Sequence, residues 1–256
     1  MISQFPPLSP ILRPPWMTVE LGGTLQVLSW ALVGGGLTTA RRLVWREVRN
    51  RDLPTSVNPR RWLEEAVAVE GLSDAVALVT SHPLARHRVA TAQVEGFAVD
   101  VVATVGLGNA ERVGTRVMPP VEPPASFSGP FIRSPAPRSP EDGPGFHAGT
   151  INLGVRIRWG LTPSALTEAL SLVASARTAA ILDAGILLNT PAGVPPWATG
   201  TGTDCIVVAA PAGSQDYCGL HTPLGEALGR AVYEAVHKGA VHWRDGQIPG
   251  KGETPS

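Results

Sequence analysis

The chain has 256 residues, 43% of them hydrophobic, so it can bury one sizeable core, and its length allows one large domain or two small ones. Its 21 Lys and Arg residues balance 21 Asp and Glu residues, and without a basic excess a nucleic-acid partner is not expected. The two cysteines, Cys205 and Cys218, are too few for a disulfide framework in a chain this long, which favours a reducing, cytoplasmic location. The first residues have no continuous apolar region like that of a signal peptide, and no stretch reaches the ~20 apolar residues of a membrane span, so no membrane partner is expected.

Proline-rich segments set the expected boundaries of the folded part. Residues 116–145 contain nine prolines, a composition that supplies neither a helix nor a sheet ladder, and we predict a long surface loop there. The tails at residues 1–17 and 244–256 are rich in Pro, Gly and polar residues and are expected to be flexible. A single domain at residues 18–243 therefore remains, interrupted by the loop.

Several strands are expected in chain order. Apolar runs at residues 25–33, 75–80 and 98–105, each bounded by Gly, Ser, Asp or His, suit buried strands. In residues 151–159 apolar and polar residues alternate, and this period of two predicts a strand with one buried and one polar face. The run Cys205–Ala210 predicts a further buried strand.

Two helices have marked ends. One is expected at residues 163–185 and one at residues 223–239, because each follows a Thr-Pro pair suited to the cap and first helical position, and each ends on a glycine. Since strands and helices interleave, we expect an α/β or α+β layered single domain with a mixed sheet flanked by helices.

Glycine-marked junctions beside the apolar runs are the first candidate binding positions. In VGGGLTTARR, Gly34 and Gly35 either let the backbone approach a ligand closely or form a simple turn. In VGLGNAERVG, Asn109 follows a strand and either donates to a substrate carbonyl or closes an Asx turn.

The sequence HAGTINLGV leads into the alternating strand. Thr150 is either a nucleophile, with His147 as its base, or a structural residue at the start of the strand. The alternation puts Asn152 on the polar face together with Arg156 and Arg158, so Asn152 is expected to be available to a site.

The sequence ATGTGTDCIVVA brings hydroxyls, amides and a carboxylate together. Thr201, Thr203 and Asp204 suit the binding of a polar substrate edge, the orientation of water or the stabilisation of an oxyanion, whereas the alternative is an ordinary loop whose Asp caps a turn. Glu226 lies in the first turn of the second helix, where the alternative is a surface ion pair with Arg230. The histidines lack metal-ligand spacing, so no metal site is expected.

These junctions occur in an order that resembles one family. The chain resembles the adenosylcobinamide amidohydrolases in LSWALVGGGL at 28–37, TVGLGNAERVG at 104–114, GTINLGV at 149–155, SARTAAILDAGI at 175–186, TGTGTDCIVV at 199–208 and LGEALGRAVYEAV at 224–236. The similarity extends from about Val27 to Val236. Two features depart from the family pattern: the Pro-rich segment is longer, and Arg177 stands where a Lys is expected.

The resemblance implies an amidohydrolase that cuts the linear amide of adenosylcobinamide, giving adenosylcobyric acid and aminopropanol in cobalamin salvage. A corrinoid is then the small-molecule substrate, and no cofactor is called for. From the demands of this chemistry we assign Asp204 or Glu226 as base and proton carrier, with Asn109, Asn152 and the amides around 201–203 binding the carbonyl and neighbouring corrin amides. Thr150 as a covalent nucleophile is the rival mechanism.

We further expect the strands that carry GTIN and TGTGTD to be neighbours in one sheet, with their polar ends at a shared cleft that Glu226 borders. Two other functions compete with hydrolysis of adenosylcobinamide: a non-catalytic corrinoid-binding or trafficking protein, and an amidase acting on a smaller substrate. The sequence leaves the formation of a homo-oligomer open.

Overall fold

The computed structural model describes residues 5–49, 52–53, 56–115, 149–188 and 193–246. Within these ranges the strands are β1 (Ile11–Arg13), β2 (Trp16–Ser29), β3 (Gly36–Glu47), β4 (Ala75–Thr80), β5 (Arg88–Val94), β6 (Phe97–Val105), β7 (Ala110–Glu111), β8 (Ile151–Ile157), β9 (Gly200–Thr201) and β10 (Cys205–Ala210). The α-helices are α1 (Pro59–Val69), α2 (Pro163–Asp183) and α3 (Pro223–Asp245), and a 3-10 turn covers Leu84–Arg86.

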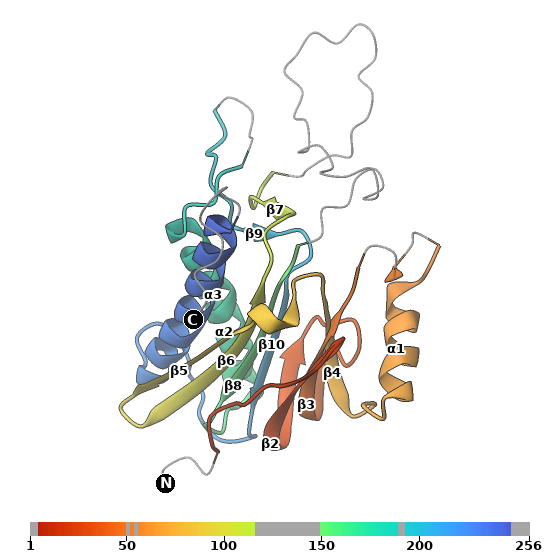
Figure 1. Ribbon diagram of the computed structural model, residues 1–256. Coiled ribbons are helices and arrows are strands. Elements are labelled where there is room, and N and C mark those ends of the chain that lie inside the picture. The colour runs from red at the N-terminus through yellow and green to blue at the C-terminus, as the bar shows by residue number, and fades with distance from the viewer. Residues whose placement is uncertain (1–4, 50–51, 54–55, 116–148, 189–192, 247–256) are drawn as a thin grey trace, which may run out of the picture.

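Eight strands form one mixed sheet in the order β4-β3-β2-β10-β8-β6-β5, with β1 added to β2, while β7 and β9 form a separate ribbon (Figure 1). The expected α/β architecture, a mixed sheet flanked by helices, is confirmed. The predicted Pro-rich loop at 116–145 lies outside the described residues, and so does His147.

The sheet bends so strongly that its two halves pack against each other. Gly154 in β8 faces Trp45 in β3, although β2 and β10 separate these strands along the sheet. Across the same interior, Asn152 Nδ2 donates a hydrogen bond of 2.6 Å to the main-chain oxygen of Val79 in β4. The inner face is a continuous apolar cluster with members from five strands, including Met17, Val19, Leu43, Leu78, Val102 and Val207.

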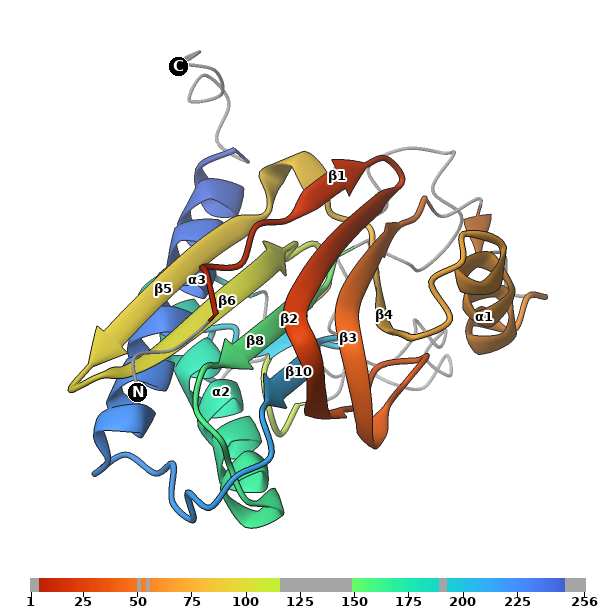
Figure 2. The ribbon, with the colours of Figure 1, turned by 90° about the horizontal axis from the view of Figure 1, so that it is seen from below.

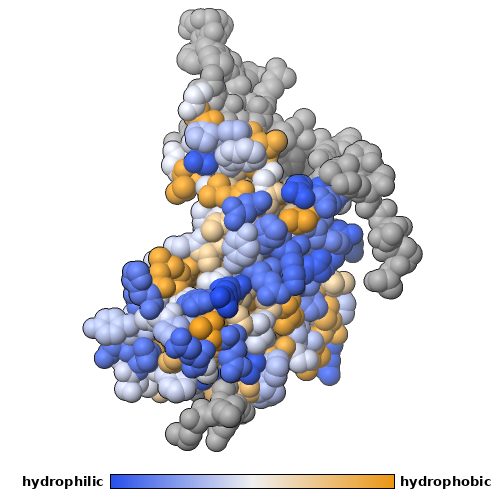
Figure 3. Space-filling model, turned by 90° about the vertical axis from the view of Figure 1, so that its left-hand side faces the viewer, coloured by the Kyte–Doolittle hydropathy of each residue, from blue (hydrophilic) through white to orange (hydrophobic). Residues whose placement is uncertain are grey.

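The helices cover the outer face of the bent sheet. Helices α2 and α3 pack together over β5, β6, β8 and β10, whereas α1 covers β3 and β4 with Leu63 and Val67 (Figures 1 and 2). Helix α2 is long and apolar enough to cross a membrane by length and composition alone, but Leu166, Val173 and Ile181 are buried in the core that it shares with α3 and the sheet. The surface seen from the α3 side is mainly hydrophilic (Figure 3).

Both expected helix starts are confirmed. The Thr162 hydroxyl accepts from the Ala165 amide, and the Thr222 hydroxyl accepts from the Gly225 amide, so each Thr-Pro pair caps its helix as predicted. The expected end of the second helix is wrong, because α3 continues through Gly239 to Asp245. A Cβ at Gly239 would lie 2.6 Å from a Val105 methyl group, so this glycine allows close packing on β6 rather than stopping the helix.

The first residues are more ordered than expected. Residues 1–17 are predicted to form a flexible tail, but β1 pairs in antiparallel register with the start of β2, from Ile11 opposite Thr18 to Arg13 opposite Trp16. The strand expected at 25–33 both begins and ends earlier, since β2 covers Trp16–Ser29. The segment at 11–13, whose composition alone indicates a loop, thus becomes a strand by pairing with β2.

The polar face expected for β8 is not exposed, and this prediction is wrong. Arg156 is 1% exposed, and its guanidinium donates to Asp100 and to the Leu21 and Pro6 carbonyls. Arg158 makes two further bonds to the buried Asp100 carboxylate. The alternation is real, but its polar side is buried: the Leu21 carbonyl of the folded-over half accepts from Arg156, and Asp100 of the neighbouring strand β6 supplies the opposite charge.

Replacing Gly154 by Ala should destabilise the fold. A Cβ there would lie 2.5 Å from Trp45 Cη2 and 2.8 Å from a Leu43 methyl group, so the two halves of the sheet must separate. We expect the free energy of unfolding to fall by about 1–3 kcal/mol in urea titrations. Gly229→Ala, at an open helical position, is the matched control and should gain up to about 1 kcal/mol. Equal stability of both variants would refute the packing of the two halves.

Replacing Asp100 by Asn should destabilise the fold by about 3–5 kcal/mol near pH 7, because the Arg156 charge stays buried without its counterion. Burial alone would raise the pKa of Asp100, but hydrogen bonds from Arg158, Arg156 and Thr91 hold it below its usual value. Its contribution to stability is therefore complete above the ordinary pKa of about 3.9 and is lost as the pH falls through the lower pKa of the folded state. The variant should lack this acid-dependent loss.

The exposed pair Arg61–Glu65 provides the control for that experiment. Glu65→Gln should change stability by less than about 1 kcal/mol, because surface ion pairs contribute little. An equally small effect of Asp100→Asn would show that the buried network is not needed for the fold.

Candidate functional site

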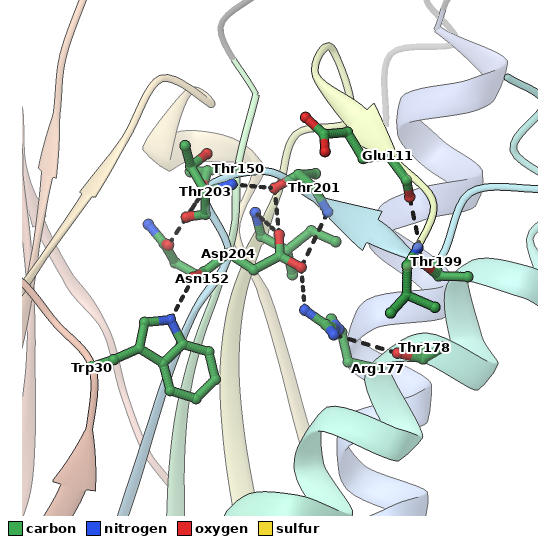
Figure 4. A network of polar contacts seen from close by, with 12 residues as sticks. Trp30, Glu111, Thr150, Asn152, Arg177, Thr178, Thr199, Thr201, Thr203 and Asp204 are labelled. Atoms are coloured by element: carbon green, nitrogen blue, oxygen red, sulfur yellow. Dashed lines mark hydrogen bonds and ion pairs between the residues drawn. The ribbon is translucent and has the colours of Figure 1, made fainter. Parts of the chain in front are cut away.

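The order of the strands gathers the polar junctions at one end of the sheet. Strands β8 and β10 are parallel neighbours, with Asn152 paired to Cys205, so the expected adjacency of GTIN and TGTGTD is confirmed. The β7–β9 ribbon pairs Ala110 with Thr201 and brings the segment after β6 to the same place. Figure 4 shows the resulting cluster.

Asp204 is the centre of this cluster. Its carboxylate forms an ion pair with Arg177 of α2, accepts from the Thr201 hydroxyl, and accepts from the amides of Thr201 and Ile151 at 3.2 Å each. Burial raises the pKa of Asp204, while Arg177 and the donors from Thr201 and Ile151 oppose this shift. One side chain thus connects α2, β9 and the start of β8.

Arg177 supplies the positive charge at the position where the family resemblance suggests a Lys. Its second terminal nitrogen donates to the Thr178 hydroxyl at 3.3 Å, and its Nε is buried without a partner in the described part of the chain. Gly200 fits beside this pair, because a Cβ there would lie 2.7 Å from the Asp204 carboxylate. Arg177 therefore places a positive charge beside Asp204.

The two threonine hydroxyls hold the main chain together. Thr150 donates to the Thr203 carbonyl at 2.7 Å, and its oxygen lies 3.4 Å from Asn152 Oδ1. The Thr203 hydroxyl donates to the Gly149 carbonyl and accepts from Asn109 Nδ2, both at 3.1 Å. The partner of the Thr150 hydroxyl is thus a peptide oxygen and not a side-chain base.

The two asparagines differ in what they leave for a ligand. Asn152 is 1% exposed, and its amide nitrogen is committed to Val79 in β4, so its expected availability is not what the structure shows. Asn109 lies nearer the surface, and its Oδ1 is a buried acceptor without a partner among the described residues. Asn109 is therefore the less buried of the two, and its Oδ1 is an acceptor that no described residue uses.

Glu226 is not part of this cluster, and the expectation that it borders the site is wrong. Strand β10 leads away from Asp204, and α3 begins only after the connection at 211–222, at the end of the sheet opposite the β7–β9 ribbon (Figure 1). There Glu226 forms an exposed ion pair of 2.5 Å with Arg230, the alternative that the sequence also allowed.

Gly34 and Gly35 lie in the connection between β2 and β3 and have structural reasons to be glycine. Gly34 has a φ of +71° and lies against Val76, while a Cβ at Gly35 would lie 2.4 Å from the Ala31 carbonyl oxygen. The simple-turn alternative explains both residues without a ligand.

Two ionisable groups at this end of the molecule are absent from the sequence-based candidates. The Glu111 carboxylate lies 2.8 Å from the position that a Cβ on Gly202 would occupy, so it faces the TGTGTD loop. His82 is buried beside Gly106, and burial together with Arg86, His242 and Arg88 lowers its pKa to about 4, so it is neutral at pH 7. Glu111 lies two residues after Asn109, and His82 lies two residues after the end of β4. These positions are the sequence signals that point to them.

A model of the adenosylcobinamide amidohydrolase family matches residues 9–247. The chain belongs to this family. The match starts within the segment predicted as a tail, in agreement with the pairing of β1 to β2. An uncharacterised protein of Methanocaldococcus jannaschii is 37% identical over 89 residues, which are 34% of this chain and 34% of that protein. The alignment thus spans about one third of the length of that relative.

Proposed function

We propose that this member of the adenosylcobinamide amidohydrolase family hydrolyses the linear amide of adenosylcobinamide to adenosylcobyric acid and aminopropanol. The observation that carries the proposal is the convergence of three separate junctions. Asn109 donates to the Thr203 hydroxyl, and Thr150 donates to the Thr203 carbonyl. The Thr203 hydroxyl in turn donates to the Gly149 carbonyl, and the Ile151 amide donates to Asp204. Segments far apart in sequence that meet in one polar cluster are expected when they serve one reaction.

The reaction requires three things: polarisation of the amide carbonyl, attack by an oxygen nucleophile, and protonation of the leaving amine. We assign the binding of the carbonyl to the main-chain amides around 201–203, and the binding of a neighbouring corrin amide N–H to Asn109 Oδ1. We assign the base and proton carrier to Asp204, because burial raises its pKa and so makes the carboxylate more basic. Glu111 takes the place of Glu226 as the second carboxylate near the reacting amide.

Water is the attacking group in this proposal. A catalytic threonine needs a base that accepts its proton, and the Thr150 hydroxyl instead donates to the Thr203 carbonyl. Asp204 has the opposite character, since a carboxylate can take a proton from water and return it to an amine.

We also propose a cellular location for this activity. The fold has the features of a soluble domain, and both cysteines are free, which suits the reducing cytoplasm to which we assign the activity. The proposed partner is the corrinoid substrate, and the proposal requires neither a cofactor nor a membrane. No group of three metal-binding side chains occurs among the described residues.

Incubation of the purified protein with adenosylcobinamide, followed by mass spectrometry, tests the proposed function. We expect adenosylcobyric acid and aminopropanol in equal amounts. Intact adenosylcobinamide recovered from the protein would indicate a corrinoid-binding or trafficking protein instead. Neither binding nor turnover of the corrinoid would indicate an amidase for a smaller substrate.

The carboxylates can be ranked by matched amide substitutions. Asp204→Asn should lower turnover about a hundredfold to ten-thousandfold, the usual contribution of a positioned acid or base. Glu111→Gln should lower it by less than that, and Glu226→Gln, at the far end of α3, should leave it unchanged. Melting temperatures separate loss of catalysis from loss of fold. If Glu111→Gln is inactive while Asp204→Asn is active, Glu111 and not Asp204 is the base.

Replacing Thr150 distinguishes water attack from a covalent mechanism. Thr150→Ala should keep measurable turnover and lose roughly 1 kcal/mol of stability, because one buried hydrogen bond disappears. Thr150→Ser should retain turnover under either mechanism. If Thr150→Ala is inactive and the wild type accumulates an ester of cobyric acid detectable by mass, the threonine is the nucleophile and water attack must be abandoned.

A further inference from the structure

Trp30 is unusual among the large side chains near the cluster because it is both exposed and fixed. It follows the last residue of β2 and is 49% exposed. Its indole Nε1 donates a hydrogen bond of 2.6 Å to the main-chain oxygen of Asp204 (Figure 4). The ring is therefore held beside the proposed base while much of its surface remains open to solvent.

Further large apolar side chains are exposed near Trp30 at this end of the β2–β3 hairpin. Leu28 lies two residues before Trp30 and pairs with Leu37 of β3 in the β2–β3 hairpin. Leu37 is 61% exposed. Trp30 follows β2 directly, so it lies near Leu37 at the end of the hairpin, on the side where its indole reaches the Asp204 carbonyl. Exposed apolar surface beside a polar site indicates a contact for a ligand.

We propose that the exposed face of Trp30, together with Leu37, binds the corrin macrocycle of the substrate and so positions the amide at Asp204. This inference rests on the proposed function. A corrin is a large, flat, largely apolar ring that carries its amides on the periphery, so a surface for the ring must adjoin the group that acts on the amide. An indole supplies a wide, rigid face at a low cost in conformational entropy.

The hydrogen bond to Asp204 gives Trp30 a fixed orientation. A free indole would lose rotamer freedom on binding, whereas this ring is already ordered by its Nε1–H contact, which lowers the cost of association. Trp30 acts in this account as a substrate-binding residue through its face, and the Nε1–H contact only orients the ring.

Three variants separate the roles of the face and of the nitrogen. Trp30→Ala removes both, Trp30→Phe keeps an aromatic face without the donor, and Trp159→Ala removes a tryptophan that is 38% exposed beyond the other end of β8. We expect Trp30→Ala to raise KM about tenfold with kcat changed less than about twofold, since it removes binding shared by ground and transition states. Trp30→Phe should stay within about threefold of the wild type, and Trp159→Ala should not change KM.

Three kinetic outcomes would overturn the inference. Trp30→Phe as impaired as Trp30→Ala would mean that the residue acts through the Asp204 carbonyl. A fall in kcat at constant KM would mean that it positions the base and does not bind the ring. An unchanged KM in Trp30→Ala would mean that the corrin binds elsewhere. Melting temperatures must match the wild type for these comparisons.

Equilibrium dialysis keeps this inference separate from the proposed reaction. Dicyanocobinamide has the corrin ring but no adenosyl group, and its Kd should rise about tenfold in Trp30→Ala, as should that of adenosylcobinamide when both are measured in an Asp204→Asn background that turns over slowly. A rise confined to adenosylcobinamide would place adenine rather than the corrin on Trp30 and would refute the inference. If the wild type binds both corrinoids without hydrolysing them, the proposed reaction fails while the role of Trp30 stands.

Discussion

The arrangement of the site depends on the Asp204 carboxylate. Its four contacts come from helix α2, strand β9 and the start of β8, and each would be costly to lose in a nearly buried place. Because the main-chain oxygen of the same residue accepts from Trp30, the hairpin between β2 and β3 is attached as well. The geometry of the cluster is therefore set by one residue at the mouth of β10.

The bent sheet provides the frame for that residue. Its interior is apolar on the β2, β3 and β4 side, but β8 contributes Asn152 and Arg156, whose polar groups are satisfied by main-chain oxygens and by Asp100. Such buried polar contacts have directional requirements that apolar packing lacks, so they specify how the two halves meet. Gly154 also contributes to the fit of the two halves, because its lack of a side chain leaves room for the Trp45 ring.

The local features of the fold could be predicted from the sequence, and the features that depend on distant partners could not. The Thr-Pro pairs mark both helix starts because caps act within a few residues. The alternation in β8 gives the strand but not the burial of Arg156, since its partner surface lies more than a hundred residues away in sequence. Strand β3 escapes prediction because its threonines and arginines mask its apolar residues. The prediction that Glu226 borders the site is wrong for a similar reason, because the sequence of a helix start does not indicate at which end of the sheet it lies.

The bond from Asn152 to Val79 reaches an edge strand, since β4 pairs along its length with β3 alone in the main sheet. Edge strands open locally at a lower free energy than central ones, and amide exchange records such opening. Each opening of β4 at this point releases the Asn152 side chain and, with it, one neighbour of the Thr150 hydroxyl. We therefore expect the Asn152 side chain to stay in place only as long as β4 remains paired with β3.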